Sequence, residues 1–113
     1  MLIESYSFGK ISINGKIYHS DVIIFPDKVY DSWWRKDGHN LCLEDIQDIF
    51  VYSPEILIIG QGSPGYMQVH ESVRMGIQSG GIELFVSGTE KAVEKYNKTC
   101  GARKTVAALH LTC

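Results

Sequence analysis

Hydrophobic and polar residues alternate along the first third of the chain, the pattern typical of β-strands that bury one face. Residues 11–13 alternate and run into Asn14-Gly15, the strongest short signal for a hairpin turn. A returning strand is predicted over residues 16–25, where Pro26 stops it, and a third strand over residues 29–34. The pattern therefore predicts an N-terminal antiparallel β-meander.

Helical and extended patterns alternate along the remainder of the chain. Apolar residues at helical spacing predict three helices, over residues 43–52, 70–79 and 89–100. Short apolar runs predict three strands, over residues 56–60, 82–86 and 105–110. Thr89 is predicted to cap the third helix with its side chain. The last five elements have the order βαβαβ, and right-handed crossovers make their three strands parallel.

Length and composition indicate one folded domain over residues 1–113. Hydrophobic residues make up 44% of the chain and charged residues 21%, the balance of a globular domain rather than a disordered segment. The formal net charge of -2 provides no basic excess for binding nucleic acid, and no apolar run is long enough to cross a membrane. The N-terminal residues do not have the pattern of a signal peptide, so we expect a cytoplasmic location.

Cysteine and histidine residues give no sign of a metal site. Cys42, Cys100 and Cys113 are an odd number of widely spaced residues, and we expect reduced thiols. The histidines fall in different elements without ligand spacing. His110 and Cys113 lie three apart on the last predicted strand, so they point to opposite faces and cannot form a nucleophile–base pair. No catalytic residue, metal site or cofactor is predicted.

The segment Gly60-Gln61-Gly62-Ser63-Pro64-Gly65 matches the GxGxxG pattern of dinucleotide-binding folds. The next helix begins late after this segment, and a chain of this length holds only half of the usual double unit. We therefore expect a glycine turn at a strand end and no tight binding of NAD or FAD. A weaker alternative is that free amides around residues 62–65 hold a small anion.

Trp33 and Trp34 are neighbours in a predicted strand, so their side chains must point to opposite faces. Asp31, Trp33 and Arg35 share the face that carries two charges, and we expect this face to be exposed while Trp34 lies in the core. An exposed tryptophan flanked by arginine is a common anchor of protein interfaces, which makes Trp33 and Arg35 the candidate interface residues.

Several blocks of the chain together resemble the small Mth-type domain of unknown function. That family includes the adipogenesis-associated domain protein and the mitochondrial complex I assembly factor three. The resemblance extends over nearly the whole chain, and its last two blocks are the most specific. The blocks are Ser7-Phe8-Gly9, Trp34-Arg35 with Gly38-His39, Ile58-Ile59-Gly60-Gln61-Gly62, Thr89-Glu90-Lys91-Ala92-Val93 with Tyr96-Asn97, and Val106-Ala107-Ala108-Leu109-His110-Leu111-Thr112-Cys113.

The resemblance implies a three-layer α/β fold around a mixed, mostly parallel sheet with an added β-meander. This implied fold agrees with the βαβαβ order and the meander predicted from the pattern. The family supplies no catalytic residues. Its eukaryotic members imply assembly or regulatory roles through protein contacts.

Two classes of function therefore remain open. The first is a non-enzymatic protein-binding or assembly-factor-like module that acts on an unidentified protein partner, as a monomer or a homodimer. The alternative is a domain that binds a small ligand or anion, or an enzyme, at the edge where the parallel strands end. The candidate residues of that edge lie in the segments 60–65, 87–90 and 110–113, and they are Gly60, Gly62, Ser63, Gly65, Thr89, His110 and Cys113.

Overall fold

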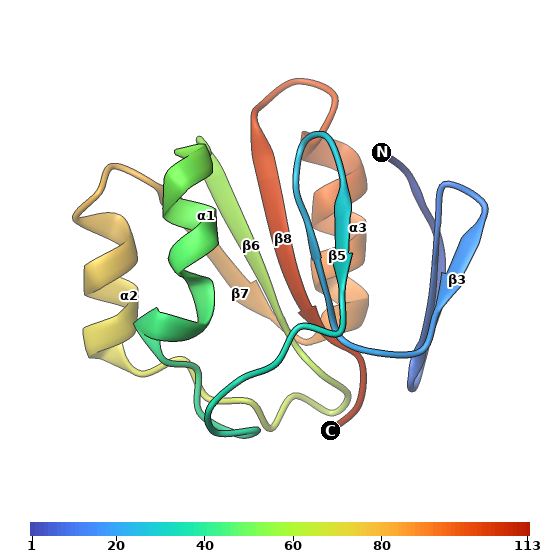
Figure 1. The fold of residues 1–113 in the computed structure, drawn as a ribbon, viewed down its shortest axis with the longest axis horizontal. Coiled ribbons are helices and arrows are strands. Elements are labelled where there is room, and N and C mark those ends of the chain that lie inside the picture. Colours follow the sequence, from blue (N-terminus) through green and yellow to red (C-terminus); the bar gives the residue numbers. More distant parts are fainter.

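The computed structural model describes residues 1–113 and contains two β-sheets, with helices on both faces of the larger sheet (Figure 1). The smaller sheet is the predicted antiparallel meander, in the order β1-β2-β3. Its strands are β1 (Ile3–Ser7), β2 (Lys10–Ile13) and β3 (Lys16–Tyr18). Asn14 and Gly15 form the β2–β3 turn, and both have the positive φ angles that this tight hairpin requires.

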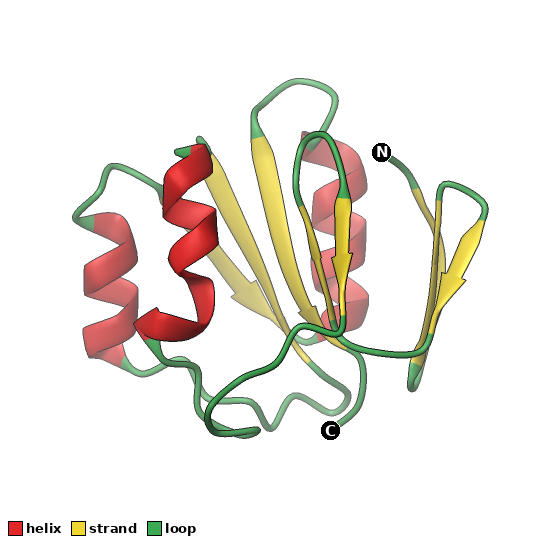
Figure 2. Cartoon of the chain, viewed as in Figure 1, coloured by secondary structure: helices red, strands yellow, loops and turns green.

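The predicted strand over residues 16–25 is in fact two short strands in different sheets. β3 belongs to the meander, whereas β4 (Val22–Ile24) belongs to the larger sheet, where it pairs with β5 (Val29–Asp31). Residues between β3 and β4 carry the chain from one sheet to the other, so the N-terminal meander stands apart from the main sheet (Figure 2).

The larger sheet has five strands in the order β5-β4-β8-β6-β7. β6 (Ile56–Gln61) lies between β7 (Glu83–Ser87) and β8 (Thr105–His110) and is parallel to both. These strands alternate along the chain with α2 (Glu71–Gln78) and α3 (Thr89–Thr99), which confirms the predicted βαβαβ order. β4 pairs antiparallel with β8 and adds the β4–β5 hairpin at one edge of the sheet.

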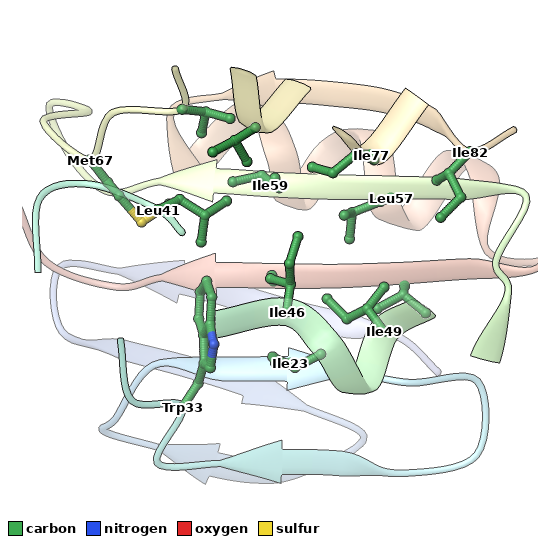
Figure 3. Close-up of a cluster of buried hydrophobic side chains, with 14 of the residues drawn as sticks. Ile23, Trp33, Leu41, Ile46, Ile49, Leu57, Ile59, Met67, Ile77 and Ile82 are labelled. Atoms are coloured by element: carbon green, nitrogen blue, oxygen red, sulfur yellow. The ribbon is translucent and has the colours of Figure 1, made fainter. Parts of the chain in front are cut away.

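Two apolar clusters on opposite faces of the larger sheet make the fold a three-layer one. On one face, η1 (Leu43–Ile46), α1 (Gln47–Tyr52) and α2 cover Leu57 and Ile59 of β6 (Figure 3). On the other face, α3 covers Ile56 and Ile58, and the same apolar cluster extends to Ile3, Ile11 and Ile13 of the meander. Both clusters need a continuous apolar run in β6, as expected of a central strand. The predicted α/β fold class is confirmed.

The meander is joined to α3 by one amide side chain. Asn97 accepts a hydrogen bond from the Ile3 amide at 3.0 Å and donates one to the Ile3 carbonyl at 2.8 Å, as a neighbouring strand would.

The longest helix, α3, has 11 residues, and none of the helices is long and apolar enough to span a bilayer.

Candidate functional site

The C-terminal ends of β6, β7 and β8 meet at one edge of the sheet, as predicted for parallel strands. The hydroxyl of Thr89, directly after β7, connects the other two segments. It accepts a hydrogen bond from the Gly62 amide at 2.8 Å and donates one to the His110 carbonyl. The Ser63 amide donates to the Thr112 carbonyl at 3.0 Å. These hydrogen bonds involve four of the seven candidate edge residues: Gly62, Ser63, Thr89 and His110.

Close packing explains the first two glycines of the GxGxxG segment, Gly60 and Gly62. A Cβ atom at Gly60 would lie 2.7 Å from the Thr89 hydroxyl oxygen. At Gly62, where φ is +93°, a Cβ atom would collide with the Thr112 carbonyl oxygen. These glycines let the α3 N-terminus and the C-terminal segment approach β6, a role that requires no phosphate.

The predicted helix-capping role of Thr89 is wrong. Gly88 occupies the cap position of α3, and no side chain caps this helix. The buried hydroxyl of Thr89 points instead toward β6 and β8, where Gly62 and His110 bind it. A hydroxyl engaged in this way cannot reach the amides of the first helical turn.

A polar pocket of about 510 Å³ lies on the outer side of this edge, and we call it the strand-end pocket. Gly62, Ser63 and Thr89 line it together with Glu90 and Lys91. The amides of Gly62 and Ser63 already donate to protein oxygens, so they are not free to bind an anion. The candidates outside its lining are Gly60, Gly65, His110 and Cys113.

His110 forms a buried cluster with Asp21 and Arg35, and its Cδ2 lies beside Gly62, where an added Cβ atom would come within 2.7 Å of it. Oδ2 of Asp21 lies 2.8 Å from Nη1 of Arg35 and 2.8 Å from Nδ1 of His110. The second oxygen, Oδ1, accepts the Leu111 amide at 2.7 Å. The cluster therefore ties the start of β4 and the loop after β5 to the end of β8.

Nδ1 of His110 lies 2.8 Å from Oδ2 of Asp21, which can only accept, and 3.0 Å from Nη2 of Arg35, which can only donate. We assign the proton to Nδ1, because this tautomer donates to the charged carboxylate, and the contact with Arg35 is then not a hydrogen bond. Nε2 of His110 and Nε of Arg35 are buried without a hydrogen-bond partner. Burial raises the pKa of Asp21, but hydrogen bonds from His110, the Leu111 amide and Arg35 outweigh burial and hold this pKa below its ordinary value.

The predicted positions of the two tryptophans are reversed, and Arg35 is buried. Trp33 is 5% exposed and its indole Nε1 donates to the Asp45 carbonyl at 3.0 Å (Figure 3), whereas Trp34 is 74% exposed. The Arg35 guanidinium lies 4.7 Å from the centre of the Trp33 ring, inside the protein. Trp33 and Arg35 therefore do not form the exposed tryptophan–arginine pair that the sequence predicts, although Trp33 lines the floor of a surface groove described below.

A bulge after β5 causes this reversal. Ile23 pairs with Tyr30, so regular pairing would continue with Asp21 opposite Ser32. Ser32 instead has a φ of 61°, and the Trp33 amide donates to the Asp21 carbonyl at 2.9 Å. One extra residue shifts every later side chain to the other face.

Trp34 stands beside a groove between β5 and the η1–α1 segment, which we call the β5–α1 groove. Its volume is about 520 Å³. Apolar contact surface comes from Tyr30, Trp33 and Trp34. The helical wall carries the polar and charged residues Glu44, Asp45, Gln47 and Asp48, with Lys36 at the loop. A shallower depression of about 280 Å³ shares Tyr30 and Asp48 and extends toward the exposed Val51.

Asp21, Tyr30 and Trp34 are central to these sites, and the sequence does not predict their roles. Asp21 lies in a segment interpreted as continuous strand, although the polar run His19-Ser20-Asp21 was a signal that the strand is interrupted. Tyr30 and Trp34 were assigned to a buried face. The sequence does not predict the bulge at Ser32, because the bulge needs a positive φ and serine, unlike glycine or asparagine, rarely adopts one.

The chain is similar in sequence and fold to proteins of unknown function. A family model described as "Protein of unknown function (DUF498/DUF598)" matches residues 3–111. The crystal structure of conserved hypothetical protein PH1505 from Pyrococcus horikoshii OT3 is similar over 100% of both chains, at 23% identity and a TM-score of 0.88.

Two further solved structures share the fold. "MT938" matches at 24% identity and a TM-score of 0.82, covering 99% of this chain and 98% of the other. A solution NMR structure of a Bordetella pertussis protein, described as "a Mth938-like domain", matches at 15% identity and a TM-score of 0.68, covering 97% and 85%. Both agree with the resemblance to the Mth-type domain, and at these identities they establish the fold alone.

Proposed function

The chain belongs to the family described as "Protein of unknown function (DUF498/DUF598)", and on this premise we propose that it is a non-enzymatic protein-binding module, of the kind that assembly factors use. Its binding surface is the β5–α1 groove. The observation that carries the proposal is the exposure of Trp34 beside Tyr30 at an apolar groove with charged walls. Tryptophan and tyrosine are enriched among the residues that dominate binding energy at protein interfaces.

The surroundings of Trp34 support a fixed docking surface. Its neighbours Trp33 and Arg35 are both buried, and Arg35 is bound to Asp21. The backbone that carries Trp34 is therefore anchored on either side. A backbone that is fixed before binding loses little conformational entropy when a partner covers the side chain that it carries.

The strand-end pocket is a weaker candidate for the working surface. Its lining has no aromatic residue and no aliphatic one other than Pro64, and Glu90 and Glu94 outnumber Lys91 among its charged residues. Two acidic residues disfavour the small anion that is the alternative ligand at this edge. No contact in this pocket favours a particular substrate.

Affinity capture with matched variants tests the proposal. The chain, Trp34→Ala and Phe8→Ala are immobilised, and each is exposed to an extract of the native organism. Phe8 is 61% exposed and lies in the turn between β1 and β2, so it controls for the general loss of a surface aromatic residue. We expect the wild type and Phe8→Ala to retain the same partner protein, and Trp34→Ala to lose it.

Equal melting temperatures of the three proteins are required for this comparison. They are expected, because truncating an exposed side chain usually changes stability by less than about 0.5 kcal/mol. Equal capture by Trp34→Ala and the wild type, or no specific partner for any of the three, contradicts the proposal.

A further inference from the structure

The β5–α1 groove adjoins a strand with one unpaired side. β5 is an outer strand of the five-stranded sheet and pairs only with β4. The Phe25 amide donates to the Lys28 carbonyl at 2.8 Å, so Phe25 and Lys28 are a hydrogen-bonded pair of the β4–β5 hairpin. Every second pair of an antiparallel ladder is hydrogen-bonded, so the next such pair is Ile23 with Tyr30. The amides and carbonyls of Val29 and Asp31 therefore point away from β4, toward the free edge of the sheet.

Side chains of an added strand would enter the groove. Tyr30 lies opposite Ile23, a member of the apolar cluster beneath α1, so the Tyr30 side chain is on the α1 face of the sheet. A strand paired with β5 would place every second side chain on that same face, beside Tyr30, and Trp34 lines the same groove where the chain leaves β5. Backbone pairing would supply affinity and the groove would supply selectivity.

The charges around the groove select the occupant. Three carboxylates, on Glu44, Asp45 and Asp48, line it against one lysine, Lys36, which pairs with Glu44 at 4.0 Å. Asp31 is on the other face of β5, because its partner Val22 belongs to the apolar cluster beneath α3. A second copy of this chain, paired through β5, would bring these acidic surfaces together, so like-charge repulsion disfavours self-association here.

We infer that the β5–α1 groove binds an extended, cationic segment of the partner protein, which adds as a strand to the free edge of β5. This inference rests on the proposed protein-binding function. Lysine or arginine side chains of the segment face Glu44 and Asp48, and its apolar side chains contact Tyr30 and Trp34. The other outer strand, β7, lies beside Lys91, Lys95 and Lys98 and so does not compete for a cationic segment.

Backbone-amide NMR of the isotope-labelled chain tests the inference with defined probes. The probe is a capped peptide of about eight residues that alternates lysine and valine. One control replaces each lysine by glutamate, and the other carries N-methyl groups on the edge that would pair with β5. We expect the lysine peptide to shift the Val29 and Asp31 amides and the Trp34 indole signal, with a dissociation constant on the order of a millimolar.

Variants separate charge from backbone pairing. Glu44→Gln with Asp48→Asn should weaken binding of the lysine peptide by about tenfold, whereas Glu94→Gln on α3 should leave it unchanged. The N-methylated peptide should bind at least about tenfold more weakly than the unmodified one. Binding of the glutamate peptide with equal affinity, shifts confined to β7 or the strand-end pocket, or no shift at all overturns the inference.

Failure of this inference is distinguishable from failure of the proposed function. If Trp34→Ala loses the captured partner but the lysine peptide does not bind, the groove is a docking surface for a different kind of segment. If Trp34→Ala retains the partner, the proposed function fails whatever the peptide does.

Discussion

Individual side chains decide how the segment after β5 is held, and the Asp21 carboxylate is central among them. It receives hydrogen bonds from Arg35, His110 and the Leu111 amide, which belong to two regions far apart in the sequence. A buried ion that loses its partner costs far more than the pair contributes. The cluster therefore fixes the position from which Trp34 is presented.

Replacing Arg35 by methionine should destabilise the protein by about 3–5 kcal/mol, because it leaves the largely buried Asp21 without its cation. Arg103→Met is the matched control, since Arg103 pairs with Glu83 at the surface and such pairs contribute about 0–1 kcal/mol. Urea unfolding of the three proteins measures the difference. Similar losses for the two variants would show that the cluster does not hold this region.

The lowered pKa of Asp21 gives stability a definite dependence on pH. The folded protein keeps this carboxylate ionised at pH values below its ordinary pKa of 3.8, where the unfolded chain binds the proton. The unfolded state then holds more protons, so the free energy of unfolding decreases as pH falls from about 4 through the folded pKa. The gap in stability between wild type and Asp21→Asn should narrow over this range, as measured by urea unfolding. A constant gap would contradict the assignment.

The two neighbouring tryptophans should respond in opposite ways to truncation. Trp33→Ala removes a buried indole that packs near Ile46 and should cost about 3–5 kcal/mol (Figure 3). Trp34→Ala should change the free energy of unfolding by less than about 0.5 kcal/mol. Denaturant midpoints decide between this arrangement and an unbulged strand, for which the larger loss would belong to Trp34.

At the scale of elements, the sequence was most informative where the pattern is regular. The continuous apolar run of β6 and the helical spacing in α3 predicted both elements and their order. The break between β3 and β4 and the bulge at Ser32 were missed, because each depends on a contact with a distant residue. Asp21 makes both of these contacts, through its carboxylate to Leu111 and its carbonyl to Trp33.

The same contrast applies to the candidate sites. Parallel strands had to bring Gly62, Thr89 and the end of β8 to one edge, and they do. Which face the His110 side chain occupies, and what binds the Thr89 hydroxyl, depends on packing that no local pattern records. The β5–α1 groove was missed for a similar reason, since the bulge alone turns Trp34 outward.

Two glycines with positive φ should differ in their tolerance of alanine. In Gly62→Ala, the alanine must adopt a left-handed backbone conformation and its Cβ atom collides with the Thr112 carbonyl. In Gly15→Ala, the backbone conformation is also left-handed, at φ +82°, but the space around the Cβ atom is open. Gly15→Ala should cost about 1–2 kcal/mol, the usual penalty of this conformation, and Gly62→Ala clearly more. Thermal unfolding compares them. Equal losses would mean that the C-terminal segment moves aside easily.

At the scale of the whole molecule, the two candidate surfaces lie on different parts of the protein. The strand-end pocket lies at the C-terminal ends of β6 and β7, whereas the β5–α1 groove lies along an outer strand of the sheet. The strand-end pocket is polar, and the amides of Gly62 and Ser63 in its lining already donate hydrogen bonds within the protein. The β5–α1 groove combines exposed aromatic side chains, an unpaired strand edge and an acidic wall, a combination suited to a protein partner.

Amide hydrogen exchange of the chain, alone and with its captured partner, tests the central claim most directly. The Val29 and Asp31 amides point away from the sheet and should exchange rapidly in the free chain. In the complex we predict slower exchange at these two residues and across residues 43–52, with no change at residues 62–65 and 87–91. Protection confined to residues 62–65 and 87–91, with β5 unaffected, would contradict the claim that the β5–α1 groove is the binding surface.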